Sequence, residues 1–140
     1  MICVKDVSLT INKHLILDEV SLEVRSGEAI GLVGGNGSGK TMLMKCICGF
    51  HRSFSGEIIV LGKKICKEVE FPPKTRFIIE NPAFLPYLSG YENLKILADI
   101  QKIVGKNEII KYMELVGLNP KEKKSVRKYS LGMKQRLGIA

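Results

Sequence analysis

The sequence has no tryptophan, few aromatic residues and no long apolar run. No apolar stretch reaches the roughly 18–20 residues that a membrane-spanning helix needs, so we expect no segment to cross a bilayer. The opening residues, Met1–Asp6, lack the basic-then-apolar order of a secretory signal peptide. These absences favour a soluble protein of the cytoplasm.

The four cysteines form no Cys-x-x-Cys pair and have no histidine cluster beside them. That arrangement argues against a zinc site. Cys46 and Cys48 lie in an apolar stretch, where a free cysteine behaves as a small hydrophobe. We therefore expect reduced thiols that are buried or half-buried.

The chain has 140 residues, of which 45% are apolar, enough for one globular domain with a core. Its net charge of +8 is uneven, because residues 1–70 carry +1 and residues 71–140 carry +7. No aromatic residues are interleaved with the basic ones and no nucleic-acid motif is present. The positive charge is thus expected to form a solvated face, with no nucleic acid as partner.

Two segments alternate apolar with polar residues, residues 7–11 and residues 20–24, with a turn signal at residues 12–14 between them. This pattern predicts an antiparallel hairpin. The fully apolar run at residues 29–33 predicts a strand buried on both faces. The remaining pattern predicts strands at 57–61 and 76–79, and helices at 40–49, 90–104, 107–116 and from about residue 130. Strands followed by helices favour an α/β core with a helical insertion.

One glycine-rich segment carries recognisable chemistry. It matches the phosphate-binding loop G-x-x-x-x-G-K-[ST], as Gly34-Gly35-Asn36-Gly37-Ser38-Gly39-Lys40-Thr41. The glycines let main-chain N–H groups curl around phosphate oxygens at the start of a helix. Lys40 would reach the β- and γ-phosphates, and the Thr41 hydroxyl would bind Mg²⁺.

The context supports a phosphate loop over a merely flexible glycine turn, because an apolar run precedes it and a helical pattern follows. The loop alone does not select a function. GTPases, nucleoside kinases, helicases and transport ATPases all carry it. The second half of the chain has to distinguish them.

Near the C-terminus, the segment Tyr129-Ser130-Leu131-Gly132-Met133-Lys134-Gln135-Arg136 resembles the LSGGQ signature of ABC-type ATPases. Ser130, Gly132 and the Lys-Gln-Arg continuation match that signature. Tyr129, Leu131 and Met133 depart from it as they do in the ATP-binding subunits of bacterial bacitracin or lantibiotic exporters. The resemblance runs over the entire chain.

This resemblance implies an α/β fold: a P-loop NTPase core with N-terminal antiparallel β strands and a helical subdomain, truncated before the Walker B strand. It implies a nucleotide-binding core at residues 1–89 and a helical subdomain at 90–140. ATP and Mg²⁺ are the implied ligands. The implied partners are an integral membrane permease and a second ATP-binding subunit in a head-to-tail dimer. The protein would then lie on the inner face of the cell membrane.

Three residues have roles that the resemblance alone suggests. Ser130 and Gly132 would meet the γ-phosphate of ATP held by the other subunit, although Ser130 could equally be a plain helix N-cap. Glu80 takes the position of the Q-loop glutamine and would act on Mg²⁺; the alternative is an ordinary carboxylate at a strand end.

No catalytic residue is expected in this chain, because the family's Walker B carboxylates and switch histidine follow the signature helix. We therefore expect the 140-residue chain alone to be inactive in hydrolysis. A soluble ABC-type ATPase outside transport, or a fragment that binds nucleotide without chemistry, are the alternatives. A GTPase or nucleoside kinase would leave the signature-like segment unexplained.

Overall fold

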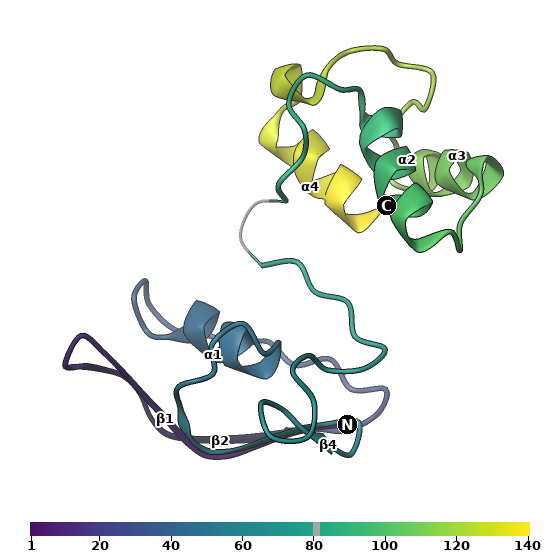
Figure 1. Ribbon diagram of the computed structural model, residues 1–140. Coiled ribbons are helices and arrows are strands. Elements are labelled where there is room, and N and C mark those ends of the chain that lie inside the picture. Colours follow the sequence, from purple (N-terminus) through teal and green to yellow (C-terminus); the bar gives the residue numbers. More distant parts are fainter. Residues whose placement is uncertain (80–81) are drawn as a thin grey trace. The chain divides into compact units, whose positions relative to one another are not determined.

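The computed structural model describes residues 1–79 and 82–140, without the side chain of Gln101. The chain forms two compact units, residues 1–79 and residues 80–140 (Figure 1). Within the described residues, no helix has both the length and the apolar character needed to cross a membrane.

The first unit is built on an antiparallel sheet of four strands. They are β1 (Ile2–Ile11), β2 (His14–Val24), β3 (Ser55–Val60) and β4 (Lys63–Lys64), in the order β2-β1-β3-β4. The β1–β2 turn has positive φ at Asn12 and Lys13, the twist that suits a two-residue hairpin. The predicted hairpin and the strand near residues 57–61 are confirmed.

Helix α1 (Lys40–Ile47) lies over one face of this sheet, as Figure 1 shows. It buries Leu43, Cys46 and Ile47 in the apolar cluster formed by the strands. All four cysteines are free; Cys46 and Cys48 are buried, and Cys3 and Cys66 are half-buried, as predicted. Burial raises the pKa of Cys46 to about 11, with a smaller effect from Cys66, so its thiol stays protonated and unreactive at neutral pH.

Two predicted strands, 29–33 and 76–79, are wrong: neither segment pairs as a strand in the structure. Ile30 is 51% and Val33 98% exposed, whereas the apolar pattern had predicted burial. A strand exists only where a neighbour accepts its backbone hydrogen bonds. Within residues 1–79 and 82–140, no segment lies beside either run as a paired strand.

The second unit is helical. It contains α2 (Gly90–Gln101), α3 (Lys106–Leu115), the 3-10 helix η1 (Val126–Lys128) and α4 (Leu131–Ile139). The three predicted helices are confirmed, with α2 ending earlier because Lys102 takes a left-handed conformation. Phe84 packs against this unit's core, so the compact unit includes residues before 90. The functional division at residues 89 and 90 stays a prediction.

A capping box starts α2. Ser89 Oγ accepts from Glu92 N at 3.3 Å, and Glu92 Oε2 accepts from Ser89 N and from Ser89 Oγ, both at 2.7 Å. We expect Ser89→Ala to lower the free energy of unfolding by about 1 kcal/mol. Urea denaturation checks this, with Ser53→Ala on an exposed loop as control; equal stability of the two variants would contradict it.

The same cap predicts a pH dependence. Hydrogen bonds from Ser89 lower the pKa of the Glu92 carboxyl below its usual value. A lowered pKa contributes stability that is present above the unfolded-state pKa and lost as the pH falls through the folded-state value. The difference in free energy of unfolding between the wild type and Ser89→Ala should therefore become smaller as the pH is lowered, which urea denaturation at acidic and neutral pH measures.

Candidate nucleotide-binding site

The loop at residues 34–41 leads directly into α1. Gly37 and Gly39 have φ of +81° and +84°, a conformation that favours glycine. Gly39 is also the N-cap of α1, and its carbonyl accepts from Leu43 N at 2.9 Å. A Cβ there would lie 2.8 Å from Ile16 O and 2.9 Å from Leu17 Cδ2, so the start of α1 is packed tightly on β2.

This close approach predicts a large effect of Gly39→Ala. The added methyl group would collide with the β2 backbone and would hold a non-glycine residue at positive φ. We expect nucleotide affinity to fall more than tenfold and the variant to be destabilised by about 2 kcal/mol. Isothermal titration and urea denaturation measure both. Gly27→Ala is the control, because Gly27 shares the positive φ and a Cβ there meets nothing within 4 Å.

The Lys40 ammonium lies inside the curve of the loop. Its Nζ donates to Gly34 O at 2.8 Å, to Gly35 O at 2.7 Å and to Ser38 Oγ at 3.2 Å. An ammonium group has three donors, so these bonds use all of them. The cation is thus held beside the N-terminal amides of α1, which already favour an anion. The arrangement is suited to holding phosphate groups.

The candidate magnesium ligands are only partly described. Thr41, the second residue of α1, has an exposed hydroxyl side chain at the same helix start. Glu80, the other predicted ligand, lies outside the described residues. Within the part of the chain that the structure describes, no three His, Cys, Asp or Glu side chains gather as a metal site. A hydroxyl beside bound phosphates fits the oxygen preference of Mg²⁺.

The other predicted contacts, Ser130 and Gly132, lie in the second unit. Ser130 is the N-cap of α4, and its Oγ accepts from Met133 N at 3.2 Å. The N-cap interpretation is therefore confirmed, yet the hydroxyl proton remains a possible donor to a ligand. A Cβ added at Gly132 would meet nothing within 4 Å, so packing among the described residues does not require glycine there.

Three polar side chains organise the second unit in ways that the sequence did not predict. Arg136 Nη1 donates to Val116 O at 3.2 Å and to Gly117 O at 3.1 Å, which satisfies carbonyls at the end of α3. Asn93 on α2 and Tyr129, the first residue of the signature-like segment, are both buried. Asn93 bonds to Ser89 O, four residues away, and to the backbone of Leu85, eight residues away. A polar residue on the apolar face of α2 was the signal for Asn93, whereas the core around Tyr129 comes from residues far from it in the sequence.

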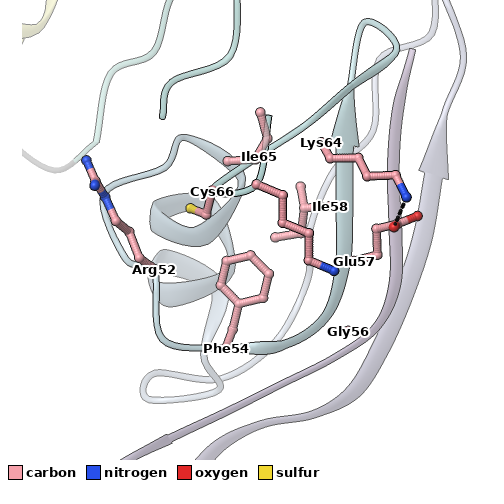
Figure 2. Close-up of a pocket in the computed structure, with 9 residues that line it drawn as sticks. Arg52, Phe54, Gly56, Glu57, Ile58, Lys64, Ile65 and Cys66 are labelled. Atoms are coloured by element: carbon pink, nitrogen blue, oxygen red, sulfur yellow. Dashed lines mark ion pairs between the residues drawn. The ribbon is translucent and has the colours of Figure 1, made fainter. Parts of the chain in front are cut away.

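A separate small pocket of about 80 Å³ lies beside the β3–β4 hairpin in the first unit (Figure 2). Two of its cationic side chains are paired: Lys64 with Glu57 at 2.7 Å and Arg52 with Glu70 at 3.0 Å. The Lys64 pairing lowers the pKa of Glu57 and raises the pKa of Lys64. The pocket is too small for a nucleotide and contains no residue of the phosphate loop.

Comparison with known proteins shows the family to which the chain is similar. The ABC transporter family profile matches residues 17–140. The chain is 41% identical over 140 residues to the uncharacterized ABC transporter ATP-binding protein YybJ of Bacillus subtilis, covering all of this chain and 64% of that protein. It is 40% identical over 126 residues to the bacitracin transport ATP-binding protein BcrA of Enterococcus faecalis, covering 89% and 41%.

A third relative is the lantibiotic transport ATP-binding protein SrtF of Streptococcus pyogenes, 34% identical over 140 residues, covering all of this chain and 60% of that protein. The chain thus spans 41% to 64% of the length of these three relatives. Among solved structures, a dimeric ATP-binding cassette in a post-hydrolysis state bound to ADP and phosphate has a TM-score of 0.80 at 19% identity. That match covers 99% of this chain and 67% of the other, and it confirms the α/β P-loop fold.

Proposed function

Because the chain belongs to the ABC transporter family, we propose that it acts in the ATP-binding subunit of a transporter, coupling ATP binding and hydrolysis to export by a separate membrane subunit. The observation that carries this proposal is the phosphate loop: the Lys40 ammonium lies in its curve, and α1 begins at Lys40, directly after its N-cap Gly39. The relatives named for bacitracin and lantibiotic transport support export.

In this proposal, residues 34–41 hold the phosphates of ATP. Lys40 exchanges carbonyl partners of the loop for phosphate oxygens, since its three donors are all engaged within the loop. Thr41 and Glu80 would bind Mg²⁺. When bound, the ion would neutralise charge that develops on the transferred phosphoryl group. The glycines at positive φ keep side chains away from the phosphates.

The proposed roles of Ser130 and Gly132 need a second copy of the subunit. The hydroxyl of Ser130 and the free amides at the start of α4 would donate to the γ-phosphate held by a partner in a head-to-tail dimer. The N-cap bond uses a lone pair of the Ser130 oxygen and leaves its proton for that phosphate. The cap would fix the direction of the hydroxyl group.

The membrane partner is testable directly. We expect the full-length protein to co-purify with an integral membrane permease and to fractionate at the inner face of the cell membrane. Detergent extraction followed by affinity purification from the native host measures this. Recovery of the protein only as a soluble species would favour the alternative of an ABC-type ATPase outside transport.

We further propose that residues 1–140 by themselves bind nucleotide without hydrolysing it. The family's water-activating carboxylates are matched by no residue of this segment, and a phosphate cradle alone does not position the attacking water. Phosphate release by the purified polypeptide should equal that of buffer. Robust Mg²⁺-dependent turnover would contradict this.

A further inference from the structure

The residues just before the signature serine are held by a loop that precedes α2. Val126 N donates to Leu88 O and Arg127 N donates to Pro86 O, both at 2.8 Å. Ser89 and Ser125 form an antiparallel bridge at the end of this pairing. The turn at residues 85–89 is therefore hydrogen-bonded to residues 125–127, which include the start of η1. We call this pairing the latch; it ends three residues before Ser130.

The side chain of Asn93 stabilises residues 85–89 of the latch by hydrogen bonds. Its Oδ1 accepts from Leu85 N at 2.7 Å, and its Nδ2 donates to Leu85 O at 3.1 Å and to Ser89 O at 2.9 Å. Asn93 is 4% exposed, so these bonds are shielded from water. One amide group on α2 thus fixes both ends of residues 85–89.

Tyr129 holds the segment between the latch and Ser130. It directly precedes Ser130, is 6% exposed and belongs to the helical core with Leu137 and Met113. A Cβ at Gly90 would lie 2.8 Å from Tyr129 Oη, so the phenol occupies space that only glycine leaves at the start of α2. Burial raises the pKa of Tyr129 and keeps the phenol neutral.

Tyr129 is also one of the positions at which this segment departs from the family signature. An aliphatic residue there would fill the core, but it would carry no hydroxyl group to meet the Gly90 backbone. The segment that leads to Ser130 is thus held against α2 in two places, by Asn93 through the latch and by Tyr129 at Gly90.

We propose that Asn93 and Tyr129 are positioning residues for Ser130, acting through the latch to hold its hydroxyl where a phosphate of the partner subunit's ATP arrives. The inference rests on the proposed function, because it assumes that Ser130 contacts nucleotide. Neither side chain touches the nucleotide itself. A hydroxyl donor must meet its phosphate acceptor within about 3 Å, so a small shift of the segment loses the bond.

The test uses the full-length protein with its membrane partner. Tyr129→Phe removes only the hydroxyl group. Asn93→Asp replaces the Nδ2 donor with a carboxylate oxygen, which would face the carbonyl oxygens of Leu85 and Ser89 without a hydrogen bond. We expect each variant to lower kcat about fivefold to tenfold, as expected for one or two lost buried bonds. Affinity for fluorescent ATP under non-hydrolysing conditions should stay within about twofold. The controls are Tyr112→Phe and Asn107→Asp on the exposed face of α3.

The outcomes separate this inference from the proposed function. If kcat and ATP affinity fall together with the melting temperature, or if neither changes, the positioning role is wrong. Should Asn93→Asp fail to fold, the kcat of Tyr129→Phe alone decides whether the positioning role holds. A Ser130→Asp variant in the same assay is the reference: unimpaired kcat there would overturn the signature assignment itself. Loss of kcat in Ser130→Asp, with unchanged Tyr129→Phe and Asn93→Asp, would overturn this inference only.

Discussion

Replacing Lys40 by alanine should reduce ATP affinity by about a hundredfold or more. The ammonium group is bonded to the carbonyls of Gly34 and Gly35, within the loop that would hold phosphate. Each charge-assisted hydrogen bond to a phosphate oxygen contributes about 1.5–3 kcal/mol, so the loss of two corresponds to roughly 10²–10⁴ in the dissociation constant. Isothermal titration with ATP and Mg²⁺ measures the change.

The fold should tolerate this substitution. Among the described residues, the Lys40 ammonium bonds within the loop, to Gly34 O, Gly35 O and Ser38 Oγ, and Lys40 belongs to neither core cluster. The melting temperature should therefore change by only a few degrees. Lys67→Ala removes one positive charge from the same unit and should retain full affinity, which separates the local contact from the net charge. Retained ATP binding in Lys40→Ala would refute the site assignment.

The parts of the structure that the sequence predicted are those with local causes. The hairpin follows from alternation within residues 2–24 and from a turn that tolerates positive φ at Asn12 and Lys13. The start of α1 follows from the glycine and lysine spacing of residues 34–41. The N-cap role of Ser130 is equally local, because its acceptor and donor are three residues apart.

The predictions that failed, or that could not be made, concern segments whose structure depends on residues elsewhere in the chain. The run at residues 29–33 has the composition of a buried strand, but composition supplies no partner for its backbone N–H and C=O groups. The two residues of β4 are both lysines, and only pairing with β3 makes them a strand. The latch links residues 85–89 to residues 125–127 across two helices, a separation at which no periodic pattern relates the two segments.

The second large effect is expected at Ser130, where two roles must be separated. Ser130→Asp keeps the N-cap, because aspartate accepts from the Met133 amide as well as serine does. It removes the hydroxyl proton and places a negative charge where a phosphate would arrive. Loss of the donated bond together with like-charge repulsion amounts to about 3 kcal/mol, or roughly a hundredfold in ATP-dependent association of two subunits.

Companion variants at this position make the result specific. Ser130→Thr retains both the cap and the donor and should associate almost normally, whereas Ser130→Arg loses the cap and fills the start of α4 with a bulky side chain. Analytical ultracentrifugation of the full-length protein with ATP, under conditions that prevent hydrolysis, measures association. ATP binding to the single subunit should be equal in all three variants, because residues 34–41 lie in the other unit. Normal association of Ser130→Asp would leave Ser130 as a helix cap alone, since the cap is the one role that aspartate preserves.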